Sequence, residues 1–384
     1  MREPDKRQFL KGTITNCNVL CQNMTIRISA CWVFLSIGLG GLLSVGCSVS
    51  QPPSHVPSAV SKEIKEKADE LDLKSKARTY DQVHHLADLA WPIVSKNLDI
   101  CGKHTMWYSG LYLALGSKYS ETERELIFRD KAMKFDGKPL VHHVVRDSPA
   151  DTVGISAGDH IVAIGAYRLD KEEQRKFARA AVKRMDDLVR KGEPFSISYS
   201  RNSQQTEVTL VPQRVCRHEI SISNSAAINA YTDGNRIRFT RGIMEFGQSD
   251  RFLQAVFAHE LAHGIYNHPR KSIPKAFVGL ILDLAALSQG VWSGGRFTQV
   301  CSQFQNKDLE READYVAYYL LANAGIDFEG AFDEWEDIAV RFKGGNRRSS
   351  THPTSAERLV IGEKIATEIN KKIASGKPLR PNRH

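Results

Sequence analysis

Residues 250–268 read DRFLQAVFAHELAHGIYNH, and this stretch decides the fold class of the surrounding chain. Ser249 and Asp250 stand directly before its apolar part, and both residue types cap helices well. Pro269 follows the stretch, and proline ends a helix because it lacks the backbone N–H and clashes with the preceding turn. The sequence therefore predicts a helix that begins at Ser249 or Asp250 and stops before Pro269.

The motif H-E-x-x-H lies inside this predicted helix. His259 and His263 are four residues apart, so both imidazoles project from one face and can reach a single metal ion. Glu260 lies about 100° further around the axis, within reach of a water molecule that a zinc ion would activate. Glu260 can then act as general base when that water attacks a peptide carbonyl. We expect His268, at the helix end, to be a surface residue and not a third ligand.

A third ligand is predicted in a second helix. Residues 306–325, NKDLEREADYVAYYLLANAG, carry asparagine and aspartate caps near their start and a glycine at their end. Glu310 and Asp314 are four apart and share one helix face, so Glu310 can bind the metal. Asp314 can then accept the free ring N–H of a ligand histidine, a common arrangement around metal ligands. Glu312 points to another side, and we expect it to be solvated.

The pair HELAH and EREAD resembles the M48 gluzincin peptidases of the CAAX prenyl protease and HtpX type. The resemblance covers about residues 220–365. It implies one zinc ion per chain, with the first glutamate of the E-x-x-A-D pattern, Glu310, as third ligand. It also implies that Asn229 and Ala230 belong to an edge strand along which a substrate chain lies extended.

The segment SSTHPTSAERL near the C-terminus matches the Thr-His-Pro segment of the same family. The match implies a catalytic role for His352, either in stabilising the oxyanion or in temporarily closing the metal site. A histidine that only packs a loop is the alternative. Residues 276–295 stand where membrane-embedded relatives have a spanning helix. Asp283, Gln289 and a glycine-rich end make a span costly, so we expect an amphipathic or buried helix, with a membrane-contacting segment as the alternative.

Alternating apolar and polar residues mark the β-structure. Between 220 and 239 the alternation flanks Thr232-Asp233-Gly234-Asn235, which predicts a β-hairpin. Residues 144–166, VVRDSPADTVGISAGDHIVAIGA, resemble a PDZ domain, in which residues 160–164, 195–199 and 207–211 would be strands. The resemblance implies binding of peptide C-termini at a sheet edge, with the carboxylate-binding loop near 137–141. A PDZ-shaped spacer or lid without a ligand is the alternative.

The N-terminal region carries a targeting signal. Residues 28–45 are uncharged and apolar, follow Arg27, and lead to Gly46 and Cys47 and a polar, proline-rich stretch. This order resembles a bacterial lipobox in which Cys47 is lipidated, while an uncleaved membrane anchor is the alternative. Either interpretation places the rest of the chain in the cell envelope, facing the periplasm. Ser48 after the cysteine is typical of lipoproteins sorted to the outer membrane.

Three cysteines follow Cys47, namely Cys101, Cys216 and Cys301, so at most one internal disulfide can form among them. A bridge between Cys101 and Cys216 is conceivable outside the cytoplasm, but spacing alone does not show it.

The chain as a whole reads as an α+β protein with a mainly helical gluzincin domain, a small hairpin and edge-strand sheet, and a PDZ-like β-rich domain. Its 384 residues predict two or three domains. Residues 62–130 read as helices, including MWYSGLYLALG at 106–116. We expect these domains: 1–47, signal peptide with lipobox; 48–61, linker; 62–130, N-terminal helices; 131–213, PDZ domain; 214–384, zinc metallopeptidase domain.

Two functions compete at this point. The net charge of +9 comes without a basic run interleaved with aromatics, so we expect no nucleic-acid partner. The leading interpretation is a zinc metalloendopeptidase that cleaves misfolded or misassembled envelope proteins, anchored to a membrane through lipid. The alternative is an envelope chaperone or assembly factor that binds proteins through the PDZ domain. The presence of Glu260 favours chemistry, because a binding protein needs no general base between two ligand histidines.

Overall fold

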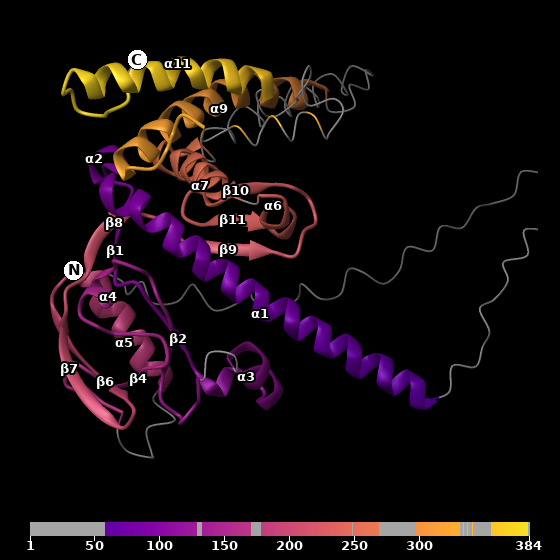
Figure 1. The fold of residues 1–384 in the computed structure, drawn as a ribbon, viewed down its shortest axis with the longest axis vertical. Coiled ribbons are helices and arrows are strands. Elements are labelled where there is room, and N and C mark those ends of the chain that lie inside the picture. The colour runs from indigo at the N-terminus through magenta and orange to yellow at the C-terminus, as the bar shows by residue number, and fades with distance from the viewer. Residues whose placement is uncertain are drawn as a thin grey trace, which may run out of the picture. The chain divides into compact units, whose positions relative to one another are not determined.

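A computed structural model describes most of the chain after residue 57 (Figure 1). By internal contacts the chain divides into Met1–Pro57 and Ser58–His384, and every described residue belongs to the second unit. The described residues are 58–128, 133–169, 178–247, 249–268, 296–330, 333, 336, 340 and 355–382, with the backbone alone at 58, 59, 296–306 and 355. Cys47, the segment 276–295 and His352 lie outside them.

Helices dominate the part of the chain that carries the predicted metal site. Four long helices pack there: α1 (Ser58–Lys96), α7 (Asp250–Ile265), α9 (Arg296–Ala324) and α11 (Ser355–Ala374). Helix α7 contacts both α1 and α9, and α11 lies on α9. Most residues of α7 are buried, as expected of a helix that is apolar nearly all round. The shorter helices α2 (Leu98–Cys101) and α6 (Arg241–Phe246) complete this region.

The two predicted site helices differ in how well their starts were predicted. Helix α7 begins at Asp250, with the Ser249 hydroxyl accepting a hydrogen bond from the Phe252 N–H, so that prediction is confirmed. Helix α9 ends before Gly325 as expected but begins at Arg296, ten residues before the predicted caps. The prediction of its start was wrong, because no helix breaker separates residue 296 from those caps.

A three-stranded sheet lies beside α7. Strands β10 (Ala230–Thr232) and β11 (Ile237–Thr240) form the predicted antiparallel hairpin, with Gly234 at a φ of +98° in its turn. Strand β9 (Ile220–Ser223) is not part of that hairpin; it pairs with β11 in parallel, so the predicted first strand was too long. The order β10-β11-β9 leaves β10 at an edge.

The PDZ-like region is a second sheet with its own apolar core. The predicted strands are present as β4 (His160–Ile164), β6 (Phe195–Arg201) and β7 (Gln204–Leu210), and β6 pairs with β7 as expected. The order is β2-β3-β4-β6-β7, with β5 beside β4. The remaining elements are β2 (Leu111–Ala114), β3 (Leu140–Val144), β5 (Tyr167–Arg168), η1 (Gly116–Lys118), α3 (Glu121–Phe128), α4 (Pro149–Thr152) and α5 (Ala178–Lys191).

The prediction that residues 62–130 are helical was wrong between α2 and η1. Thr105–Tyr108 is strand β1, and Leu111–Ala114 is strand β2. The two strands belong to different sheets, because β1 pairs with β8 (Gln213–Cys216) and β2 pairs with β3. Gly110 lies between them with a φ of +84°, and a side chain there would collide with Ser148, so the backbone turns sharply at this point. Pairing with distant strands overrides the helical spacing of the apolar residues.

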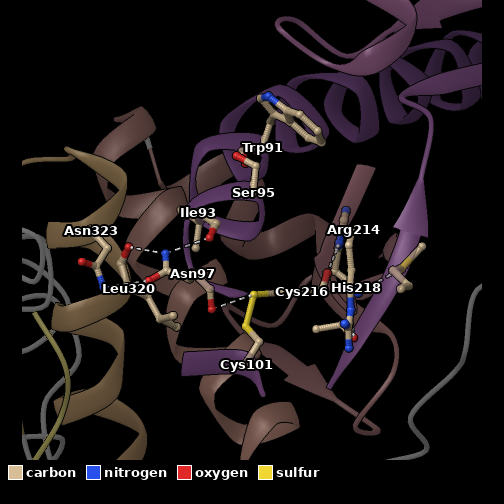
Figure 2. Close-up of a disulfide and its surroundings, with 12 residues drawn as sticks. Trp91, Ile93, Ser95, Asn97, Cys101, Arg214, Cys216, His218, Leu320 and Asn323 are labelled. Atoms are coloured by element: carbon tan, nitrogen blue, oxygen red, sulfur yellow. Dashed lines mark hydrogen bonds between the residues drawn. A yellow bond between two sulfur atoms is a disulfide. The ribbon is translucent and has the colours of Figure 1, made fainter. Parts of the chain in front are cut away.

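A disulfide joins the two ends of the inserted PDZ-like segment (Figure 2). Cys101 at the end of α2 is bonded to Cys216 in β8, with 5.6 Å between their Cα atoms, so the conceivable pairing is present. Thr105 lies opposite Cys216 in the β1–β8 pair, so the chain leaves and rejoins the helical part at one place. Buried Asn97 donates hydrogen bonds from Nδ2 to the carbonyls of Ile93 and Leu320, which ties the end of α1 to α9.

Residues from both sides of the insertion share one apolar core. The cluster contains side chains of α1, of β8 and of the site helices α7, α9 and α11. The helices before the PDZ-like segment therefore pack with the metal-site region. Within the described ranges no helix is long and apolar enough to cross a lipid bilayer.

Candidate metal centre

Three side chains from two helices converge on one point. His259 and His263 lie one turn apart on α7, and α9 packs against α7 and presents Glu310 to them. The two histidine Nε2 atoms are 3.0 Å apart. Glu310 Oε2 lies 3.3 Å from Nε2 of His259, and Oε1 lies 3.2 Å from Nε2 of His263. The three side chains are 7%, 13% and 9% exposed, so they are largely shielded from solvent.

These distances fit a zinc ion. Four-coordinate zinc has bonds of about 2.0–2.1 Å to nitrogen and oxygen, which separates neighbouring donor atoms by about 3.3 Å in a tetrahedron. The observed separations of 3.0 to 3.3 Å match that edge length. Among the described residues, His259, His263 and Glu310 are the group of three whose donor atoms approach closely enough to hold a metal. The donor set and its geometry therefore fit zinc with a fourth position open.

Asp314 orients the first ligand. Its Oδ1 lies 2.8 Å from Nδ1 of His259, which places the ring proton on Nδ1 and leaves the Nε2 lone pair for a metal. Burial alone lowers the pKa of His259, but hydrogen bonds to Asp314 and Glu310 outweigh burial and raise this pKa to about 10. Without a metal the imidazole is therefore protonated, and a zinc ion has to displace that proton.

Glu260 lies on α7 directly after His259 and is buried. The helix rotation of about 100° per residue keeps it off the ligand face but beside it. A general base needs such a position, close to the three candidate ligands without being one of them.

Arg358 is a site residue that the sequence analysis missed. It lies on α11 with its side chain 4% exposed, and its Nη2 is 3.1 Å from Glu310 Oε2. Its Nε is 3.1 Å from Asp314 Oδ2, so one guanidinium bridges the carboxylates of Glu310 and Asp314. A buried cation offsets part of the repulsion between two buried anions. The one signal in the sequence was its place at the end of the Thr-His-Pro match, six residues after His352.

His268 and Glu312 also belong to this region, contrary to prediction. His268 is 2% exposed, not a surface residue, and its Nδ1 lies 2.8 Å from Nδ1 of His263. Its Nε2 lies 2.8 Å from Oε2 of Glu312, which is 40% exposed and therefore only partly solvated. The cause is the turn after α7, where Asn267 adopts a φ of +57° and directs the chain back towards the helix.

The predicted substrate strand lies beside α7. Ala230 is buried and is the first residue of edge strand β10, whereas Asn229 is exposed and directly precedes the strand. Thr240 fixes Asn229, because the Thr240 N–H donates to the Asn229 carbonyl at 3.0 Å. Gly264 allows α7 to approach the hairpin closely, since a Cβ at that position would lie 3.3 Å from the Gly234 carbonyl oxygen. An edge strand next to the metal-binding helix offers main-chain hydrogen bonds to an extended peptide.

The predicted carboxylate-binding loop of the PDZ-like region is not at a sheet edge. Leu140 begins strand β3, which lies between β2 and β4. The Val141 N–H donates to the Asp159 carbonyl, and the Val141 carbonyl accepts from the Gly158 N–H. The placement near 137–141 was therefore wrong, because that backbone is already paired. The edges of this sheet are β2 and β7.

Comparison with protein families agrees with this geometry. Residues 210–361 match the model of peptidase family M48. Over these residues the chain is similar to that peptidase family. The match contains His259, His263, Glu310 and Arg358, and it begins where the PDZ-like sheet ends.

Curated relatives match stretches of similar length. The chain is similar to metalloprotease LoiP of Escherichia coli, with 33% identity over 144 residues that cover 34% of this chain and 56% of LoiP. Metalloprotease YcaL of the same organism is 28% identical over 39% of this chain and 60% of YcaL. Mitochondrial metalloendopeptidase OMA1 of Schizosaccharomyces pombe is 29% identical over 37% of this chain and 44% of OMA1. The chain spans about half the length of the curated relatives it matches.

Solved structures resemble part of the chain. A crystal structure of the HtrA3 PDZ domain bound to a phage-derived ligand covers 29% of this chain and 90% of that domain, with 16% identity and a TM-score of 0.22. The HtrA-type protease AlgW with a decapeptide covers 29% of this chain and 30% of AlgW, with 18% identity and a TM-score of 0.21.

Proposed function

We propose that this protein is a zinc-dependent metalloendopeptidase that cleaves misfolded or misassembled proteins of the cell envelope. The observation that carries the proposal is the convergence of His259, His263 and Glu310 at tetrahedral donor distances, with Glu260 beside them. The match to the M48 peptidase model and the relatives named metalloproteases support the reaction class. Zinc in such a site supplies a Lewis acid that activates water and polarises a carbonyl.

The protein's own residues have three tasks in this reaction. Strand β10 holds the substrate extended through main-chain hydrogen bonds, which presents a peptide carbonyl at the open side of the site. Glu260 accepts the proton of the attacking water and returns it to the departing amine. Asp314 keeps the Nε2 lone pair of His259 directed at the metal, and Arg358 holds Asp314 and Glu310 in place.

The PDZ-like region would select substrates by their C-termini. Strand β2 is an edge strand of this sheet and begins directly after Gly110. A bound peptide can pair with β2 as an added strand, on the side of β2 opposite to β3. The alternatives for this region are a spacer or a lid without a ligand.

The proposed location is the periplasmic side of the envelope, with a lipid on Cys47 as the anchor to the outer membrane. The Cys101–Cys216 disulfide supports an oxidising compartment, since such bonds persist outside the cytoplasm. The mass of the N-terminal peptide of the mature protein tests the lipid, and an unmodified N-terminus upstream of Cys47 would refute it.

The test of the proposed function is Glu260→Gln. Glutamine keeps the side-chain size but cannot accept the water proton as a carboxylate does, so we expect zinc to stay bound while cleavage of an unfolded envelope protein falls by about 100-fold or more. Glu245→Gln on α6, an exposed position, is the matched control and should cleave normally. If Glu260→Gln also complements a deletion strain fully, the essential role is binding, and the chaperone alternative replaces the peptidase.

A further inference from the structure

We propose that His268 is a positioning residue that, together with Glu312, fixes the ring of the metal ligand His263. The inference rests on the proposed function, because it concerns how this chain prepares its zinc site. It starts from a difference between the two ligand histidines. His259 has a carboxylate at its second nitrogen, whereas His263 has another imidazole there.

The hydrogen-bond chain specifies the proton on each ring. For Nε2 of His263 to bind a metal, its proton must be on Nδ1, which then donates to Nδ1 of His268 across 2.8 Å. His268 must therefore carry its own proton on Nε2, and that N–H donates to Glu312 Oε2 across 2.8 Å. Each donor meets one acceptor, and the terminal acceptor is an anion, which strengthens the bond that His268 makes.

Burial and ring geometry restrict the movement of His268. Its side chain is 2% exposed, and its ring stands at 80° to that of His263, with 4.9 Å between the centroids. Buried polar atoms are costly unless they are bonded, so an imidazole at this place is favoured when both of its nitrogens have partners. A residue that only filled space here would be an apolar one.

The chain from His263 to Glu312 also links two helices. His263 is on α7, and His268 follows the end of that helix by three residues. Glu312 is on α9, between Glu310 and Asp314. Glu310 and Glu312 thus act on the same metal site from different faces of one helix, Glu310 directly and Glu312 through His268. Substitution of such outer partners typically lowers metal affinity 10- to 100-fold.

Two substitutions at His268 separate positioning from packing. In His268→Asn the amide oxygen occupies the place of Nδ1 and still accepts from His263, so we expect zinc affinity within about threefold of wild type, well inside the range expected for full loss of an outer partner. In His268→Leu the volume is nearly kept but the acceptor is lost, so we expect a decrease of about 10- to 100-fold. A purely structural role would instead favour leucine, because an apolar side chain suits a buried site.

Glu312 provides a second, more exposed position for the test. Glu312→Leu removes the anionic acceptor at a partly exposed site, so it should fold and lower zinc affinity less than His268→Leu does. Asp308→Asn, at a side chain 80% exposed on the same helix, is the matched control and should bind zinc as wild type does.

The experiment measures zinc affinity by competition with a chromogenic chelator on the full folded chain, with far-UV circular dichroism of the metal-free variants as the folding check. Cleavage at saturating zinc gives the second readout, and we expect kcat to fall in His268→Leu while KM stays unchanged. Wild-type affinity in both His268→Leu and Glu312→Leu would overturn the inference and leave the peptidase proposal intact. Absence of zinc binding by the wild type would instead overturn the proposed function.

Discussion

The disulfide between Cys101 and Cys216 should make a large, measurable contribution to stability. The perturbation is the double variant Cys101→Ala and Cys216→Ala, because both positions are buried and serine would bring a polar hydroxyl into the core. The two cysteines are 115 residues apart, and closing a loop of that length in a fully unfolded chain corresponds to about 5 kcal/mol of lost stability when the bond is removed.

The magnitude depends on how the PDZ-like region unfolds. Strands β1 and β8 place Thr105 opposite Cys216, so a folded PDZ-like region already holds the two ends of the loop together. If this region stays folded while the helical part unfolds, the effective loop shrinks to about five residues and the expected loss falls to about 2 kcal/mol. The measured value therefore reports whether the two regions unfold together or separately.

Guanidinium denaturation followed by hydrogen exchange and mass spectrometry gives the stability of each region. EDTA in all samples removes the contribution of bound zinc, which would otherwise raise the stability of the folded state. Cys301→Ala leaves the disulfide intact and is the control. A loss below about 1 kcal/mol in both regions would refute the reasoning, because even the short loop predicts more.

Three further predictions concern the metal site. Glu310→Gln should lower zinc affinity by about 100-fold or more in a chelator competition, since a neutral amide replaces the anionic ligand. Arg358→Leu should lower the unfolding free energy of the metal-free protein by about 3–5 kcal/mol, because two buried carboxylates lose their cation, and zinc should restore part of this loss in a thermal melt. The raised pKa of His259, about 10, keeps its ring protonated at pH 7.5, so zinc binding should release about one proton there and weaken as the pH falls. Calorimetry in buffers of different ionisation enthalpy measures that release, and a release near zero contradicts a protonated ring.

Local spacing was sufficient to predict the central part of the site. His259, His263 and Glu260 follow from helix geometry within five consecutive residues, and their helix begins at the predicted cap. Glu310 and Asp314 follow from the same four-residue rule on a second helix. The β10–β11 hairpin was equally local, because Asp-Gly between alternating runs specifies the turn.

Local spacing was misleading where distant partners decide the structure. The spacing of the apolar residues between 105 and 114 suits a helix, but these residues form strands β1 and β2. The reason is that β8 provides hydrogen-bonding partners for β1, and β3 provides them for β2. Strand β9 is a second example. It pairs in parallel with β11, on the side of β11 that faces away from β10. A strand is stable only through its neighbours, and no short window of sequence contains them.

The sequence by itself determined which three side chains could share a metal ion, the place of Glu260 beside them and the two kinds of fold, because helix periodicity and turn chemistry act over a few residues. Only the tertiary structure decided what surrounds those residues. Arg358 reaches Glu310 and Asp314 from α11, and His268 turns back onto His263, with its other ring nitrogen next to Glu312. These contacts join side chains whose directions depend on where whole helices cross and end, which is set by packing of the complete chain.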